Sequence, residues 1–386
     1  MHHRLLRRAL AAGVAALAAA ALVAGPAAGA AAGPSEPVPE GFRAQSLTWV
    51  SPGRGWALGT ATCDGQPCTS VIRTSDGGSS WSAAGVVDAP IAPPGEPGLT
   101  DVDFADARHG WAYGPSLQRT SDGGRTWSAA PLPGGGRQVL ALVADAGVVH
   151  MVVSPCQLGQ PPYECTDPPT LWSAPAAGPA AGPAAWRPVD GVTLPVGASA
   201  ILAAHGRAAY VVGQLPPPTP DAFYATTDGR TWSARPTPCD KEGSADVLAD
   251  VAPTSRTDVA LLCVGDAGFS KAAKTVFRST DGARTFTPAG ITPEWGILSE
   301  LAATPGGTLA VASTSSGSWI YLNDTGADTW TTPVELGDGG AGWNDLAFTT
   351  EDVGWVVYSP VAGFPGEGTL MRTADAGRTW APVPLG

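Results

Sequence analysis

Three stretches of the chain follow one pattern: Thr74-Ser-Asp-Gly-Gly-Ser-Ser-Trp81, Thr120-Ser-Asp-Gly-Gly-Arg-Thr-Trp127 and Thr373-Ala-Asp-Ala-Gly-Arg-Thr-Trp380. We call this pattern, T-x-D-x-G-x-[ST]-W, the turn motif. Glycine supplies a positive φ and aspartate accepts hydrogen bonds from nearby backbone N–H groups, so each copy predicts a tight turn between two strands. The closing Trp predicts a buried ring at the start of the next strand. Recurrence at intervals of roughly 45 to 60 residues predicts an array of small sheets.

Three weaker copies lie between these: Thr226-Thr-Asp-Gly-Arg-Thr-Trp232, which is one residue short, Ser279-Thr-Asp-Gly-Ala-Arg-Thr-Phe286, which ends on Phe, and Asn323-Asp-Thr-Gly-Ala-Asp-Thr-Trp330, which lacks the Asp. Between Trp127 and Trp232 lies a segment without a copy. It contains Leu171-Trp172, Trp186 and, in place of the turn, the low-complexity run 174–185. One further unit fits there, so the predicted number of units is seven.

A second pattern joins an aromatic residue to a following Gly-Trp pair at one spacing: Trp49…Gly55-Trp56, Phe104…Gly110-Trp111 and Phe348…Gly354-Trp355. Each copy predicts an inner strand, a turn and a second strand, and residues 99–104 show the period-two alternation of a strand. Each unit is therefore predicted to hold four strands. The predicted fold is all-β: a seven-bladed β-propeller of four-stranded antiparallel blades over residues 42–386.

The turn motif resembles the Asp-box, or BNR, repeat of sialidase-type β-propellers, in which the box lies in the hairpin between the third and fourth strands of a blade. That resemblance implies structural roles for five aspartates: Asp76, Asp122, Asp228, Asp281 and Asp375. The regular blades with the Gly-Trp pattern look closer to photosystem II assembly-factor-type propellers and their secreted bacterial relatives. The resemblance covers nearly the whole mature chain, and it specifies the fold rather than the function.

Residues 1–30 have the organisation of an export signal. Arg4, Arg7 and Arg8 precede the apolar run 9–24, and Ala28-Gly-Ala30 provides a small-residue cleavage site. The run is too short to span a bilayer comfortably. We therefore expect a secreted bacterial protein with no membrane span after cleavage, in which 31–41 is a flexible segment rich in Pro and Gly.

Charge narrows the range of partners. The leader holds three of the 22 basic residues and none of the 34 acidic ones, which leaves a mature chain with a net charge of about −15. Such a surface argues against nucleic acid or an anionic membrane as a partner. We expect a monomer that binds a protein or a glycan.

Six cysteines in an exported chain predict three disulfides. Pairing nearest neighbours gives Cys63–Cys68, Cys156–Cys165 and Cys239–Cys263, one of fifteen possible sets. Zinc ligation is the alternative, but the sequence has no C-x-x-C and only three histidines outside the leader. Disulfides are favoured, and no metal or cofactor is expected.

The two faces of such a propeller differ. One, the motif face, carries the turn motifs; the opposite loop face carries the connections from second to third strands and from blade to blade. Every long or decorated loop is predicted on the loop face: 63–68, 156–165, 214–222, 265–274 and 359–368. The three lysines, Lys241, Lys271 and Lys274, lie there as well. Insertions confined to one face of a repeat array mark its binding face.

The inner strands are predicted to open onto that face with five acids: Asp101, Asp103, Asp250, Glu300 and Asp345. Trp295 and Trp343 stand just upstream, in predicted loops. Converging carboxylates beside exposed aromatic rings predict a binding site for a sugar or a cationic group. The competing interpretation is structural, because acids at strand ends cap backbone N–H groups and Trp at blade junctions packs.

The resemblance to sialidases implies an arginine triad and a Phe/Tyr-Arg-Ile-Pro motif. The closest match, Phe42-Arg43-Ala44, lacks Ile-Pro, and most other arginines lie in or beside the turn motifs. We therefore expect no sialidase activity. The main hypothesis is a non-enzymatic propeller that binds a protein or glycan on its loop face. The alternative is a glycoside hydrolase in which Asp101 or Asp103 pairs with Glu300 or Asp345, their separation deciding the mechanism.

Overall fold

The computed structural model describes residues 36–385, apart from 92–95, 97, 158–164, 178–184, 217–218, 240–245, 325, 327–328, 338, 340–341 and 360–367. The expected export signal, residues 31–35 and Lys241 lie outside the described residues.

The chain folds into seven four-stranded antiparallel sheets, each built from consecutive strands, as the repeats predict. Blades 1 and 2 are β1 (Glu40–Ser51), β2 (Arg54–Cys63), β3 (Gln66–Thr74), β4 (Ser82–Val87), then β5 (Asp101–Phe104), β6 (Gly110–Tyr113), β7 (Leu117–Thr120), β8 (Ser128–Ala129). Blades 3 and 4 are β9 (Gln138–Asp145), β10 (Val148–Ser154), β11 (Thr170–Pro175), β12 (Arg187–Pro188), then β13 (Ser199–His205), β14 (Ala208–Gln214), β15 (Ala222–Thr226), β16 (Ser233–Ala234).

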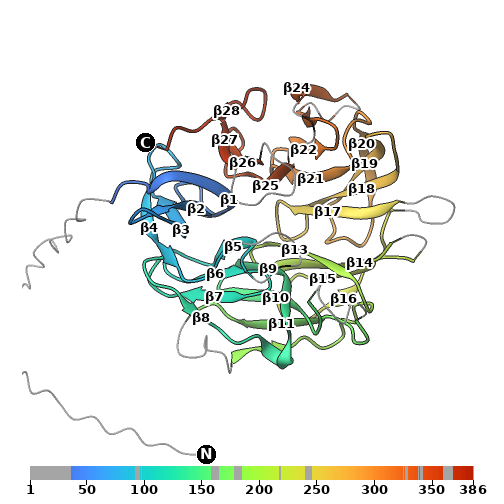
Figure 1. The fold of residues 1–386 in the computed structure, drawn as a ribbon. Helices are drawn as coiled ribbons and strands as arrows, with labels where there is room; N and C mark the ends of the chain where they lie inside the picture. The colour runs from blue at the N-terminus through green and yellow to red at the C-terminus, as the bar shows by residue number, and fades with distance from the viewer. Residues whose placement is uncertain are drawn as a thin grey trace, which may run out of the picture. The chain divides into compact units, whose positions relative to one another are not determined.

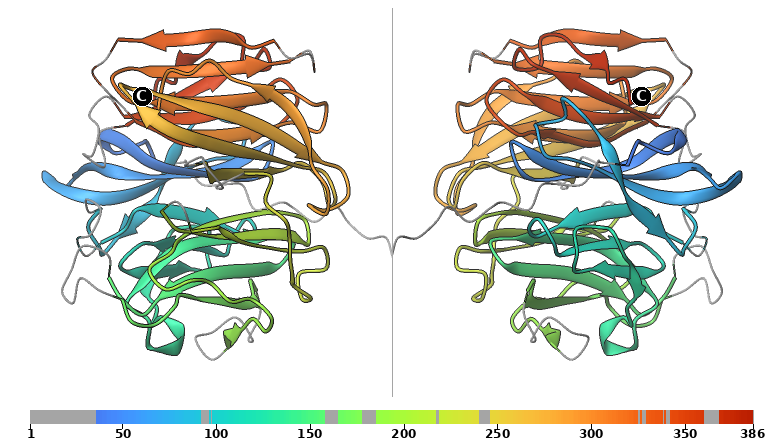
Figure 2. Two further views of the ribbon diagram at one scale, coloured as in Figure 1. Left: turned by 90° about the vertical axis from the view of Figure 1, so that its right-hand side faces the viewer. Right: turned by 90° about the vertical axis from the view of Figure 1, so that its left-hand side faces the viewer.

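Blades 5 and 6 are β17 (Val247–Pro253), β18 (Val259–Gly268), β19 (Lys271–Ser279), β20 (Thr287–Ile291), then β21 (Leu298–Ala303), β22 (Leu309–Thr314), β23 (Ser318–Asn323), β24 (Thr331–Leu336). Blade 7 is β25 (Gly342–Phe348), β26 (Gly354–Ser359), β27 (Thr369–Thr373), β28 (Ala381–Pro382), and a short 3-10 turn, η1 (Pro133–Gly135), precedes blade 3. The first strand of every blade lies innermost, around a common axis (Figure 1). Side views show the blades edge-on (Figure 2).

The turn motifs close the hairpins between third and fourth strands through one set of hydrogen bonds. In blade 2, Asp122 accepts a bond from the Thr126 N–H at 3.0 Å and another from the Thr126 hydroxyl at 2.7 Å. The Thr120 hydroxyl donates to Asp122 and accepts from the Gly124 N–H. Because these bonds favour the charged form, the pKa of Asp122 lies below its usual range despite some burial.

The Gly-Trp pattern fits consecutive strands together. Gly110 is paired with Phe104 across β5 and β6, and a Cβ at Gly110 would come within 2.6 Å of the Phe104 ring. The Trp56 ring stacks on Phe104 of the next blade, with centroids 4.0 Å apart, and its indole N–H donates to the Gly123 carbonyl. The pattern therefore joins blade 1 to the turn motif of blade 2.

All three disulfides occur as paired by nearest neighbours: Cys63–Cys68, Cys156–Cys165 and Cys239–Cys263. The first joins β2 to β3, and the second lies in the connection from β10 to β11. The third ties the segment before blade 5 to β18, inside a hydrophobic cluster.

Two expectations were wrong in detail. Residues 63–68 and 265–274 do not form long loops. The strands remain paired as far as Cys63 and Gln66 in the first case and Gly268 and Lys271 in the second, and each pair leaves a two-residue turn. The aromatic residues that close the turn motifs are half-buried, except Trp232, which is buried. No helix among the described residues is long and apolar enough to cross a membrane.

Candidate functional site

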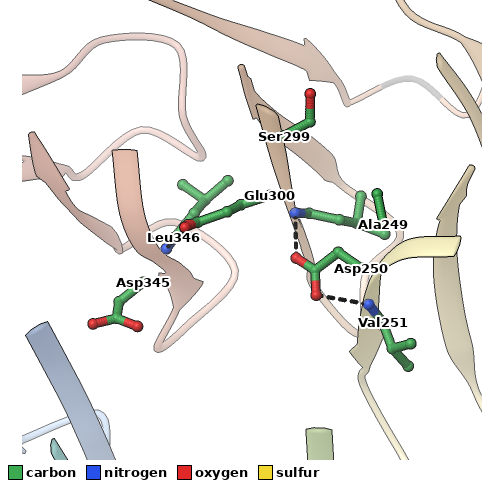
Figure 3. A pocket seen from close by; sticks show the side chains of 8 residues that line it. Ala249, Asp250, Val251, Ser299, Glu300, Asp345 and Leu346 are labelled. Carbon is green, nitrogen blue, oxygen red and sulfur yellow. Dashed lines mark hydrogen bonds between the residues drawn. The ribbon is translucent and has the colours of Figure 1, made fainter. Parts of the chain in front are cut away.

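Four of the predicted site acids are used to join blades. Asp345 accepts from Leu47 N–H at 2.6 Å, Glu300 from Leu346 N–H at 3.0 Å, Asp250 from Leu301 N–H at 2.7 Å, and Asp103 from Ala144 N–H at 3.0 Å. Each donor belongs to the innermost strand of the next blade. Figure 3 shows Asp250 bonded to the neighbouring strand and Glu300 pointing toward Leu346.

The remaining three blade junctions have the same kind of hydrogen bond, but its acceptors are residues that the sequence analysis did not identify. Val102 N–H donates to the Ser46 hydroxyl at 3.1 Å, Gly206 N–H to Asp145 at 2.6 Å, and Leu248 N–H to Asp221 at 2.9 Å. Every junction of the ring thus has a side-chain oxygen that accepts a backbone N–H of the following blade. We call these seven oxygen-bearing residues the junction acceptors. These contacts support the structural interpretation, in which the acids accept hydrogen bonds from backbone N–H groups instead of binding a ligand.

Asp101 differs from the other four acids. Its carboxylate accepts a hydrogen bond from the adjacent Thr100 hydroxyl at 2.6 Å. It lies close enough to Asp345 to raise the pKa of that carboxyl by repulsion, although burial is the larger cause. Asp250, Glu300 and Asp345 also line a cavity of about 340 Å³ between blades 5, 6 and 7 (Figure 3). The inner acids therefore surround a polar space at the axis.

Burial dominates the charge state of these carboxyls. It raises the pKa of Asp103 to about 7, that of Asp345 to about 7 and that of Asp250 to about 6. Burial also raises the pKa of Glu300 and Asp101, with repulsion from Asp345 adding to the rise at Glu300. Buried acids that repel one another are harder to ionise than isolated ones. Part of the ring of acids is thus protonated at neutral pH.

We predict that stability falls as pH rises from 6.5 to 8. A carboxyl with a higher pKa in the folded than in the unfolded state stabilises the fold while it is protonated. This contribution is fully present below the unfolded pKa, about 4, and is lost as the pH rises through the folded pKa, which is about 7 for Asp103 and Asp345. Two such groups correspond to a loss of about 1–2 kcal/mol over this interval. Burial lowers the pKa of His150 to about 4, so His150 makes stability rise with pH, but only below pH 6.5, the ordinary pKa of histidine. Urea unfolding at several pH values measures the slope, and Asp103→Asn should reduce it; an unchanged slope in that variant would contradict the assignment.

A second prediction concerns Asp345, which closes the ring between blades 7 and 1. It has a φ of +57° inside a β-bulge of β25, a conformation that Asn adopts more readily than Ala. Asp345→Ala leaves the buried Leu47 N–H without its acceptor and should cost about 1–3 kcal/mol. Asp345→Asn keeps an acceptor oxygen and should be close to neutral. Urea midpoints of the two variants measure the difference, and equal losses would show that the carboxylate charge matters instead.

The two tryptophans predicted for the site are placed differently. Trp343 is not in a loop: it lies in β25, 5% exposed, and packs on Tyr358 with ring centroids 4.9 Å apart. Its place in the pleat turns the ring inward between blades 6 and 7. Trp295 does lie in the connection before β21 and is 43% exposed. Of the two rings, Trp295 is the one available to a ligand.

Next to the Trp295 segment, at Ile297 and Leu298, the loop face carries a groove that the sequence did not reveal. A cavity of about 670 Å³ opens between blades 4, 5 and 6, lined mainly by apolar residues that include Leu215, Pro216, Val247, Val264, Ile297 and Leu298. Leu298 is 73% exposed, and Val196, beside the groove residue Gly197, is 45% exposed. Apolar side chains this exposed and this close together typify an interaction surface.

Lys274 holds one wall of that region in place. Its buried ammonium lies within 3.1 Å of four backbone carbonyl oxygens, those of Ala272, Glu294, Trp295 and Gly296. Tyr321 donates a further hydrogen bond to the Trp295 carbonyl at 2.8 Å. Burial lowers the pKa of Lys274 to about 8. Lys274 is therefore a positioning residue for the Trp295 segment.

Cations and metal ligands are sparse at the axis. Within the innermost strands, all of which are described, Arg43 is the one arginine, and it is exposed. Among the described residues, no group of three or more His, Cys, Asp or Glu side chains is arranged to hold a metal ion.

The comparisons with known proteins show a similarity of fold and do not show the function. The sequence matches no protein-family model and no curated protein sequence. The structure of YCF48 bound to D1 peptide is 16% identical, with 89% of this chain and 97% of that chain covered and a TM-score of 0.54. A prolyl endopeptidase structure is 12% identical over 88% of this chain and 50% of that one, with a TM-score of 0.51. An α-L-arabinofuranosidase from Fusarium graminearum with an iminosugar inhibitor is 14% identical over 88% and 95%, with a TM-score of 0.45.

Proposed function

We propose that this protein is an exported, non-enzymatic propeller of the Asp-box type that binds a protein partner through its loop face. The observation that carries the proposal is the apolar groove of blades 4 to 6, with Leu298 73% exposed at its edge. Water-exposed apolar area of this kind is stabilised when a partner covers it. The expected signal sequence and the disulfides are consistent with an extracellular, oxidising location.

The chemistry of the channel supports binding over catalysis. A glycosidase needs one carboxylate free to attack or activate water and one positioned to protonate the leaving group. Here Asp103, Asp250, Glu300 and Asp345 each direct an oxygen to a backbone N–H of the next blade. The structure of YCF48 bound to D1 peptide, which has a similar fold, is consistent with a polypeptide partner.

A carboxylate-dependent hydrolase is the second candidate, favoured by one feature. Asp101 lies near Asp345, and the pKa of Asp345 is raised to about 7 by burial and by that neighbour. A carboxyl with such a pKa can donate a proton at neutral pH. On this alternative, Asp345→Asn abolishes hydrolysis while leaving the fold intact.

Site-specific photo-crosslinking in the producing cells tests the main proposal. A benzoylphenylalanine at Val196 reports on the loop face, and one at the exposed Arg125 reports on the motif face as the control. We expect one discrete protein adduct from position 196 and none from 125, with binding reconstituted from the purified partner. Adducts from position 125 alone would overturn the loop-face assignment. Release of aryl from a glycoside panel, lost in Asp345→Asn, would replace binding with hydrolysis.

A further inference from the structure

The turn between β18 and β19 has an unusual residue at its tip. Phe269 and Ser270 have φ values of +47° and +70°, the backbone of a two-residue hairpin turn that favours Asn-Gly. A bulky residue at positive φ is a genuine outlier. The Phe269 side chain is also fully exposed, so packing within this chain does not compensate for the strain. The surrounding backbone holds the strained turn without covering the ring, and an exposed ring kept in such a turn points to a role outside the folded chain.

The tip is held rigidly against the neighbouring segments. Ala272 N–H donates to the Glu294 carbonyl at 2.9 Å, and Gly296 N–H donates to the Ser270 carbonyl at 3.0 Å. The Ser315 hydroxyl, from the turn between β22 and β23, donates to the same Ser270 carbonyl at 2.9 Å. With the Lys274 ammonium beneath residues 294–296, this fixes the hairpin tip to blade 6. We call residues 266–271 and 294–298 the platform.

The platform presents apolar side chains beside the groove. Phe269 is fully exposed, Leu298 is 73% exposed and Trp295 is 43% exposed. The far side of the Trp295 segment is supported by Trp319, whose ring centroid lies 5.9 Å from that of Trp295. Ala267, Ile297 and Leu298 belong to both the platform and the groove wall. The β18–β19 hairpin, gold in Figure 2, reaches outward at this face. Preorganised aromatic and aliphatic groups around a groove are the features of an interface anchor.

The charges at this surface indicate which class of partner it fits. Asp266 and Glu335 are exposed, and the Glu294 side chain is 66% exposed. On the loop face of blades 4 to 6, the cations among the described residues are Lys271, whose side chain is 43% exposed, and the buried Lys274. Lys271 lies 3.7 Å from Glu294 and 4.5 Å from the centroid of the Trp295 ring. The surface is thus apolar with a negative border, which complements basic rather than acidic ligands.

We propose that the platform and the groove bind an extended polypeptide segment in which apolar side chains are followed by Lys or Arg. The apolar side chains occupy the groove beside Leu298, and Phe269 and Trp295 cover them. The basic residues meet Asp266 and compete with Lys271 for Glu294. This proposal deepens the proposed function and rests on it. An acidic surface disfavours the anionic membrane that an exposed Phe would otherwise suit.

Two substitutions at the tip separate binding from folding. Phe269→Asn removes the ring and places a residue suited to positive φ, so it should raise the melting temperature while lowering binding at least tenfold. Ser270→Gly relieves strain at the adjacent position and keeps the ring, so it should raise the melting temperature and leave binding unchanged. A purely structural role for Phe269 would not separate stability from binding in this way.

The measurement uses the full chain with its disulfides, panned against a random twelve-residue peptide display library. We expect enriched peptides with apolar residues next to Lys or Arg, whose synthetic versions bind wild type and Ser270→Gly alike and Phe269→Asn at least tenfold more weakly. Val86→Ser, at an exposed position of β4 in blade 1, is the matched control and should leave binding unchanged. Enrichment of acidic peptides, equal binding by Phe269→Asn, binding to phosphatidylglycerol vesicles instead of peptide, or a dimer that Phe269→Asn dissociates would each overturn the inference. The crosslink from position 196 can still appear in those cases, so this failure is distinct from failure of the proposed function.

Discussion

Trp355→Ala should destabilise the protein by about 3–5 kcal/mol, the cost of truncating a large, fully buried aromatic side chain. Trp355 is completely buried at the junction between blades 7 and 1. Its ring centroid lies 4.9 Å from that of Trp49 and 6.0 Å from that of Trp81. A Cβ on Gly78, in the turn motif of blade 1, would come within 2.1 Å of it. Loss of this ring therefore opens a cavity at the place where the ring of blades closes.

Two controls make the Trp355 prediction specific. Trp127 closes a turn motif and is half-buried, so Trp127→Ala should cost about half as much. The Trp355 indole N–H is buried without a hydrogen-bond partner, so Trp355→Phe should lose less than Trp355→Ala. Guanidinium unfolding midpoints for the three variants give the order. An equal loss from Trp127→Ala would mean that the half-buried motif rings, rather than the Gly-Trp rings, dominate the junctions.

Removal of the Cys239–Cys263 disulfide should cost about 3–4 kcal/mol, because it frees a long loop in the unfolded chain. The bridge spans 24 residues of sequence, compared with five for Cys63–Cys68. Both Cys239 and Cys263 are buried in the cluster between blades 4 and 5, so the double Ala variant also leaves a small void. The matched double variant of Cys63 and Cys68 should lose about 2 kcal/mol.

The comparison of the two double variants uses guanidinium unfolding under oxidising conditions, with wild type measured with and without reductant. If the short bridge proves the more costly to remove, loop length does not control the stabilisation. The contribution of each bridge would then lie in the native contacts of its cysteines.

The fold could be read from the chain because the repeats are local. A turn motif needs only neighbouring residues: Asp122 bonds to Thr126, four residues away. The Gly-Trp pattern works over one hairpin, where Gly110 faces Phe104. The cysteine pairs are close in sequence for the same reason. Such short-range rules predict the blade, and repetition predicts the ring.

The site was harder to predict because its contacts are between blades. An acid at the start of an inner strand has the same local pattern whether it binds a ligand or the next blade, and Asp345 reaches Leu47 across 298 positions. Trp295 and Trp343 both precede such acids, but Trp343 lies within β25 with its ring buried, whereas Trp295 lies in the connection before β21 and stays exposed. Phe269 gave no signal at all, because Phe is the opposite of what a positive-φ turn selects.

Blade 1 is built entirely from the beginning of the described chain and blade 7 entirely from its end, so no strand is shared across their junction. Hydrogen bonds between Ala44 and Gly368, the Asp345 acceptor and the Trp355 ring close it instead. Val38 and Leu385 pack in the same cluster, which brings the two ends of the described chain together (Figure 1). A short linker could therefore join them, and the chain could be reopened before β9 without changing any blade. Circular permutants of this propeller should fold, because the ring has no blade that depends on where the chain starts.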